Sequence, residues 1–301
     1  MDTALTLVVP GVVLAIAASW MVWTVRQALI ARRGPNDSIE SYLRHDKATG
    51  AVAMCAAICG VVVTAVLTGN RLPLAIWPGA ILGVLVIIAF ERRWPRPSGT
   101  IRSAPLVAPR RLSTLIPWVG VVLSFLGVLV AAVVIAICWM IGDTPYGRSI
   151  SGTTLPPDNE TPNTVVRVDG FPGWTAGLMT VIGGIALLAV VAFGWWTVAR
   201  RASLRAVPPG ADLRFRRASI DRMVRILGIA AWFTASNFYE TARNAYTQLH
   251  WAARPTEPLT SGPAPWLPAV CAIAILVLYL VARPRPRAAK AAPAVTVSQS
   301  A

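Results

Sequence analysis

Long apolar runs separated by short polar segments dominate the sequence. Seven of these runs approach the roughly 17–25 residues that an α-helix needs to cross a bilayer. Helices are expected because a chain in lipid must satisfy its own backbone hydrogen bonds. The pattern therefore predicts an all-α fold, a polytopic transmembrane helical bundle that forms a single domain over residues 1–287. The expected spans cover about 5–29, 51–69, 74–91, 115–141, 174–198, 223–247 and 266–282.

The two ends of the chain are expected to differ. The first run is long, has no basic residue before it and reaches its first arginine, Arg26, only near its end, so we expect a retained span rather than a cleaved signal peptide. Residues 288–301 are expected to form a disordered cytoplasmic tail.

Basic residues alternate between the two sides of the predicted bundle. Of the 28 Lys and Arg residues, 23 lie in the segments after the first, third, fifth and seventh spans or at the adjoining span ends, where Arg26 and Arg225 fall. Such residues concentrate on the cytoplasmic side of membrane proteins. The N-terminus is therefore expected outside and the C-terminus inside, in the inner (plasma) membrane of a cell.

Composition supports this interpretation. The chain is 55% hydrophobic and only 14% charged, which excludes a soluble enzyme, a disordered protein and a disulfide-stapled secreted domain. The net charge of +15 is explained by topogenic loops, so nucleic acid is not an expected partner. The expected partners are the lipid bilayer, anionic lipid headgroups at the cytoplasmic face, and a protein partner.

The segment 199–222 is the most basic stretch. Asp212 is expected to cap a helix that continues into the sixth span, with Arg217, Asp221 and Arg225 spaced four apart. One interpretation is a topogenic loop that attracts anionic lipid; the other is a docking surface for an acidic cytoplasmic partner. The candidate docking residues are Arg200, Arg201, Arg205, Arg214, Arg216 and Arg217.

The sixth span carries a polar stripe on one helical face. Such a stripe in lipid must face protein or water. It predicts either interhelical hydrogen bonds or the wall of an externally open cavity for a small polar solute. Its residues are Thr234, Asn237, Glu240, Thr241, Arg243, Asn244 and Gln248.

Pairs of small residues four apart predict close helix crossings at Gly79 and Gly83, at Gly120 and Ser124, and at Gly173 and Gly177.

Residues 35–48 are expected to form a short amphipathic helix on the inner leaflet. Within it, Asn36-Asp37-x-x-Glu40 resembles the Asn-Asp-x-x-Asp signature of UbiA-type prenyltransferases, a resemblance that implies Mg²⁺ and diphosphate binding by Asp37 and Glu40. A second acidic motif is missing, since Asp212 and Asp221 lie nine residues apart, and the span count differs.

Motifs for other chemistry are absent, so no catalytic residue, metal ligand or cofactor is expected. The sequence has no HExxH, GxSxG or GxxxxGK[ST], and His45 and His250 lie outside the spans. The four cysteines lie in spans and are expected to be packing residues. Glu91 is expected to reach headgroup water at an inner helix end.

The arginine-rich inner loops and Phe171-Pro172-Gly173-Trp174 before the fifth span resemble uncharacterised multi-pass membrane proteins of actinobacteria. The resemblance implies no activity. We therefore expect a non-catalytic accessory or partner-binding subunit of the bacterial cell envelope. The alternatives are a transporter or solute-binding protein that uses the polar stripe, and a membrane lipid-modifying enzyme that uses Asp37 and Glu40.

Overall fold

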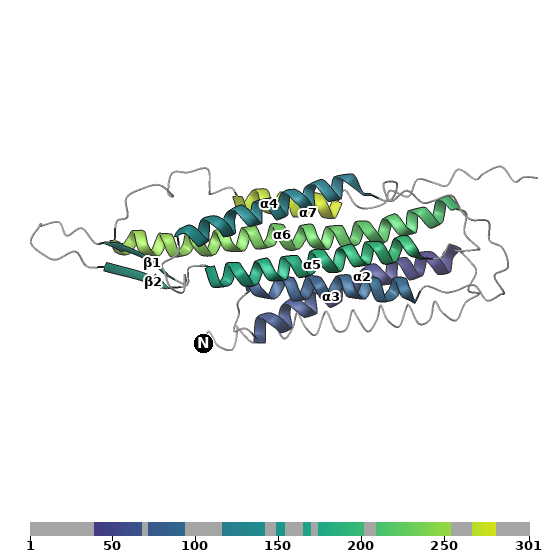
Figure 1. Ribbon diagram of the computed structural model, residues 1–301, viewed down its shortest axis with the longest axis horizontal. Helices are drawn as coiled ribbons and strands as arrows, with labels where there is room; N and C mark the ends of the chain where they lie inside the picture. Colours follow the sequence, from purple (N-terminus) through teal and green to yellow (C-terminus); the bar gives the residue numbers. More distant parts are fainter. Residues whose placement is uncertain are drawn as a thin grey trace, which may run out of the picture.

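The computed structural model describes a helical bundle with one small hairpin (Figure 1). It describes residues 39–67, 72–93, 116–141, 149–153, 165–169, 174–201, 209–253 and 267–280. The helices are α2 (Ile39–Leu67), α3 (Leu72–Arg92), α4 (Trp118–Ile141), α5 (Trp174–Arg200), α6 (Pro209–Ala253) and α7 (Leu267–Leu280). The strands are β1 (Ser149–Thr153) and β2 (Val165–Asp169). The first expected span and the expected tail lie outside the described residues.

A helix occupies each of the other six predicted span positions. Four helices, α2 to α5, are long and apolar enough to cross a membrane, over Leu43–Leu67, Ala75–Arg92, Trp118–Met140 and Thr175–Arg200. The apolar α7 is shorter, with 14 residues. The fold is therefore that of a membrane protein, whereas seven spans and an outward N-terminus stay predictions.

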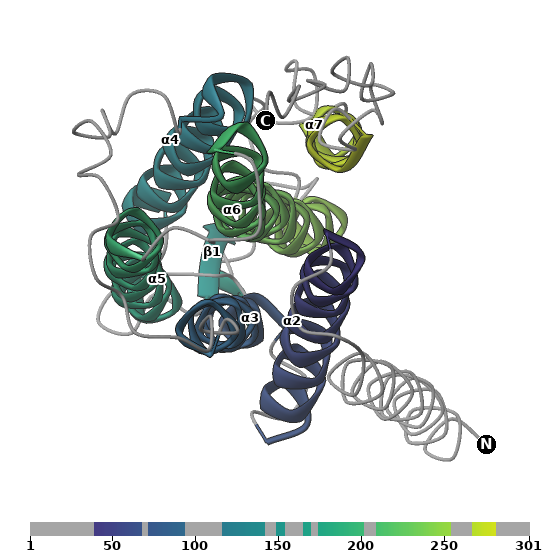
Figure 2. The ribbon, with the colours of Figure 1, turned by 90° about the vertical axis from the view of Figure 1, so that its right-hand side faces the viewer.

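Helix α6 is the element around which the others are arranged. It packs against α3, α4, α5, α7 and both strands, and end-on it lies between α4 and α2 (Figure 2). Its 45 residues correspond to about 68 Å at 1.5 Å per residue, roughly twice a bilayer core. The bundle surrounds its middle, where Trp232, Thr234 and Phe238 are buried.

Small residues allow the helices to approach closely. A Cβ built on Gly79 would lie 2.5 Å from the carbonyl oxygen of Ala57, and one built on Gly60 would lie 2.7 Å from the Cα of Gly79. At the α4–α6 crossing, the hydroxyl of Ser124 donates to the carbonyl oxygen of Val224 at 2.8 Å. The close crossings predicted from Gly79 and from Ser124 are confirmed.

The hairpin was not expected from the sequence. Strands β1 and β2 pair antiparallel, with Ser149 opposite Asp169 and Thr153 opposite Val165, and both contact α6. The fold class needs this small correction, because the loop between the fourth and fifth spans contains paired strands. The signal was present: Val165-Val166-Arg167-Val168-Asp169 is rich in the β-branched residues that favour strands.

The expected surface helix at 35–48 is wrong as a separate element. Residues from Ile39 onward belong to α2, which continues without a break to Leu67. The residues between the predicted surface helix and the second span, around Ala48 and Thr49, are buried. Tertiary packing therefore holds this segment in line with the span.

We predict that Gly79→Ala destabilises the bundle. The new methyl group would collide with the backbone of α2, and overpacking of this kind costs about 1–3 kcal/mol. The matched control is Gly184→Ala, whose Cβ would meet Trp77 no closer than 3.5 Å, an ordinary contact. Thermal unfolding of the purified chain in mild detergent measures both. Unfolding of Gly79→Ala at the wild-type temperature would contradict the close crossing.

Candidate functional site

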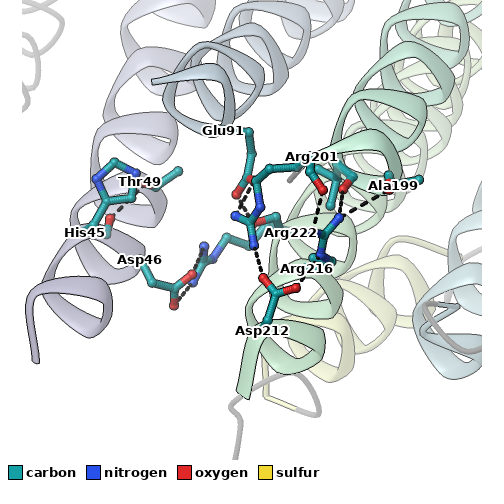
Figure 3. Close-up of polar contacts among 11 residues, drawn as sticks. His45, Asp46, Thr49, Glu91, Ala199, Arg201, Asp212, Arg216 and Arg222 are labelled. Carbon is teal, nitrogen blue, oxygen red and sulfur yellow. Dashed lines mark hydrogen bonds and ion pairs between the residues drawn. The ribbon is translucent and has the colours of Figure 1, made fainter. Parts of the chain in front are cut away.

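Four helix ends meet at one end of the bundle, which we call the ionic end. The start of α2, the end of α3, the end of α5 and the start of α6 are joined there by side-chain ion pairs (Figure 3). The central group, which we call the ion cluster, comprises Glu91, Arg201, Asp212, Arg216 and Ser219.

Arg216 lies at the centre of the cluster, with 0% of its side chain exposed. Its Nε donates to Oδ2 of Asp212 at 2.9 Å, one helical turn earlier. Its Nη1 donates to the carbonyl oxygens of Val198 at 2.6 Å and Ala199 at 3.2 Å, and its Nη2 donates to that of Arg201 at 2.5 Å. The last carbonyls of a helix have no partner within the helix. Arg216 of α6 therefore caps the C-terminal end of α5.

Arg201 closes the cluster from the opposite direction. Immediately after α5, its guanidinium turns inward and bridges two carboxylates: Nη1 donates to Oε2 of Glu91 at 2.8 Å and Nη2 to Oδ1 of Asp212 at 2.9 Å. The other oxygen of Glu91 accepts a hydrogen bond from the hydroxyl of Ser219 at 2.5 Å. Three helices, α3, α5 and α6, are thus connected through one buried group of charges.

A second ion pair ties α2 to α6. Arg222 donates to both oxygens of Asp46, at 2.7 Å from Nη1 and 2.5 Å from Nη2, which is the bidentate geometry that suits a guanidinium. Gly50 makes room for it, because a Cβ there would lie 3.2 Å from Nε of Arg222. On α6 itself, Arg225 pairs with Asp221, as the spacing of four predicted.

The charges at this site balance. Three carboxylates, Asp46, Glu91 and Asp212, face three guanidiniums, Arg201, Arg216 and Arg222. Burying an ion costs several kcal/mol unless partners and hydrogen bonds compensate for the lost water. Here every carboxylate is held by at least one guanidinium. The arrangement fits a clamp between helices, and among the described residues no group of three or more His, Cys, Asp or Glu side chains is placed to hold a metal ion.

The candidate docking residues separate into two groups. Arg201 and Arg216 belong to the ion cluster, with 8% and 0% of their side chains exposed. Arg200, Arg214 and Arg217 are exposed. Arg205 lies outside the described residues.

All residues of the polar stripe lie on α6, but they differ in burial. Thr234 is buried and donates to the carbonyl oxygen of Ala230 at 2.8 Å, and Thr241 donates to that of Asn237 at 2.7 Å. Both hydroxyls thus bond within α6, whereas the sequence predicted either bonds between helices or the wall of an open cavity. The remaining members diverge in exposure: Asn237 is half-buried, and Glu240, Arg243, Asn244 and Gln248 are exposed.

Sequence reasoning missed part of the site. The expectation that Glu91 reaches headgroup water is wrong, because only 3% of the residue is exposed. The sequence signal for its burial was a carboxylate at the end of an apolar run, with arginine-rich segments elsewhere in the chain that could pair with it.

Asp37 lies outside the described residues, and the side chain of Glu40 is also outside them, so the Mg²⁺ hypothesis stays a prediction.

Comparisons of this chain with protein families, with curated proteins and with solved structures found no match.

We predict that Arg216→Met destabilises the protein by about 3–5 kcal/mol, because it removes one of the two guanidiniums that pair with Asp212 and the donor to the carbonyls of Val198, Ala199 and Arg201. Arg216→Lys should recover only part of this loss, since an ammonium group cannot reproduce the fork of bonds. The measurement is unfolding in mild detergent. The control, Arg214→Met, removes an exposed arginine from the same turns of α6 and should change stability by less than about 0.5 kcal/mol. Equal losses in both variants would refute the clamp.

Proposed function

We propose that this chain is a non-catalytic integral membrane protein of the cell envelope, an accessory subunit that docks an acidic protein partner at the ionic end. The proposed location is the plasma membrane, with the ionic end on the cytoplasmic side. The docking surface consists of Arg214 and Arg217, which lie three apart on the exposed face of α6. Anionic headgroups of the same leaflet are proposed as a second class of contact.

The observation that carries this proposal is the separation of charges at the ionic end. Within the described side chains there, all four carboxylates are engaged in ion pairs and none is exposed: Asp46, Glu91, Asp212 and Asp221. Seven cationic residues are exposed: Arg44, Lys47, Arg92, Arg93, Arg200, Arg214 and Arg217. Among the described side chains of this end, every exposed charge is therefore positive. A field of one sign steers oppositely charged partners and suppresses association with similarly charged ones.

The ion cluster supports a presenting rather than a catalytic role. Its ionisable groups neutralise one another, so they hold helices in place instead of offering a proton donor or a nucleophile to a substrate. A rigid scaffold lowers the entropic cost of forming an interface. The transporter and lipid-modifying alternatives remain hypotheses that rest on the polar stripe and on Asp37 with Glu40.

We predict a cytoplasmic ionic end. A phosphatase reporter fused after residue 290 should be inactive, and a fluorescent reporter that folds only in the cytoplasm should be active at the same position. An active phosphatase at this position would reverse the proposed orientation and remove the cytoplasmic partner with it.

We predict that the chain, tagged and purified in mild detergent from its source cells, retains an acidic protein in stoichiometric amount. Arg214→Glu/Arg217→Glu should reduce this retention at least tenfold, because each reversal replaces an attraction with a repulsion worth about 1 kcal/mol or more. Arg214→Lys/Arg217→Lys, which keeps both charges, should retain most of it. Quantitative mass spectrometry of the purified complex gives the ratio.

The control for this experiment lies on the same helix. Arg243→Glu reverses an exposed charge on α6 far from the ionic end and should leave retention unchanged. Retention that survives the double reversal, or the lack of any stoichiometric protein, would refute the docking surface.

A further inference from the structure

A row of arginine and aromatic side chains lies across α3 and α5 near the ionic end. The guanidinium of Arg92 sits 5.2 Å from the ring centre of Phe193, and that of Arg200 sits 4.5 Å from the ring of Trp196. The two rings stack on each other, with centres 5.8 Å apart and planes 26° apart. Both distances from cation to ring are within the range of cation–π attraction. We call Arg92, Phe193, Trp196 and Arg200 the arginine–aromatic row.

The row is exposed although it is well organised. Phe193 is 42% exposed and Trp196 is 49% exposed, and both arginines are exposed. The neighbouring carboxylate, Glu91, points into the ion cluster and neutralises Arg201 instead of Arg92. The row therefore presents two guanidiniums, and Arg93 adds a third exposed cation beside them.

Apolar tracks lead away from this row along both helices. On α3, Leu82 is 42% exposed and Leu85 is 45% exposed; Leu85 follows Leu82 by three residues and Arg92 follows Leu85 by seven, a spacing that places all three on one helical face. On α5, Ile182 and Ile185 are 54% and 61% exposed and lie two to three turns before Phe193. Helices α3 and α5 pack against each other, and both run toward the ionic end.

We infer that the arginine–aromatic row binds the headgroup of an anionic phospholipid, whose acyl chains lie along the tracks on α3 and α5. The phosphate group accepts charge-assisted hydrogen bonds from Arg92 and Arg200. The rings of Phe193 and Trp196 lie beneath the headgroup, at the depth that aromatic side chains favour. Such a lipid supplies the negative charge that the arginines lack and the acyl chains that cover the exposed apolar tracks.

This inference rests on the membrane insertion proposed above, and it does not involve the docking surface at Arg214 and Arg217. A membrane protein with no docked partner still has this row facing the bilayer. Loss of the protein partner with retention of the lipid, or the reverse, therefore separates the two proposals.

The test measures bound lipid on the full-length chain in mild detergent. The protein is incubated with phosphatidylglycerol or with phosphatidylcholine of the same acyl chains, and retained lipid is counted by native mass spectrometry. Wild-type protein should retain phosphatidylglycerol preferentially and should show a raised thermal unfolding temperature with it. Arg92→Gln/Arg200→Gln should weaken this binding about tenfold or more, because two basic residues are lost. Arg92→Lys/Arg200→Lys should stay within about threefold of wild type, since the charges remain.

Two controls make the test specific. Arg44→Gln/Lys47→Gln removes two exposed cations from α2, a helix that contributes no residue to the row, at the same end of the bundle, and should bind as wild type does. Glycerol phosphate, which has the anionic group without acyl chains, should not raise the unfolding temperature. An unchanged Arg92→Gln/Arg200→Gln variant, an equal loss in the α2 control, or equal stabilisation by glycerol phosphate would each overturn the site. A thermal unfolding transition of each variant in mild detergent with phosphatidylcholine confirms that the variant is folded before heating.

Discussion

The fully buried guanidinium of Arg216 is the group on which the ionic end depends. Its loss of hydration is offset by hydrogen bonds to four acceptors: a carboxylate on its own helix, two carbonyls in the last turn of α5 and the carbonyl of Arg201 just after it. An arginine provides five donors in a rigid plane, so one side chain can cap one helix and neutralise a carboxylate on another. The chain reverses direction between α5 and α6, and this cap fixes the geometry of the reversal. Arg201 and Glu91 then extend the same group of charges to α3.

Local patterns predicted the helices well, because the bilayer imposes length and polarity on each segment by itself. The continuation of α6 into the sixth span followed from charges spaced four apart. The expected cap at Asp212 is wrong, because α6 begins at Pro209 and Asp212 lies in its first turn, where it pairs with Arg201 and Arg216. The partnership between Glu91 and Arg201 joins residues 110 apart. No local pattern encodes such a pair, because it depends on which helix ends the bundle brings together. The hairpin was missed for a different reason: its strands are short and lie within a long polar segment, where alternation is weak.

The basic segment shows what charge counting leaves out. When residues 199–222 are treated as a loop, all of their arginines belong to one candidate docking surface. On α6, however, residues Asp212, Arg216 and Ser219 recur at four and three and share a face, whereas Arg214 and Arg217 lie on the other side. Burial follows this division. If the helix is taken to include Asp212, helical periodicity alone distinguishes the buried Arg216 from the exposed Arg214 and Arg217. The same argument does not reach Arg201, whose burial depends on Glu91.

The ion cluster and the arginine–aromatic row both depend on the contact between α3 and α5. Glu91 and Arg92 are consecutive on α3, so their side chains diverge by about 100° around the helix. When Arg201 and Ser219 draw Glu91 inward, Arg92 must face outward, at the height of Phe193 on α5. A rotation of α3 that exposed Glu91 would break its bonds to α5 and α6 and would also remove Arg92 from the ring. The buried charges therefore set the rotation of α3, and through that rotation they set which cations the protein presents to its surroundings.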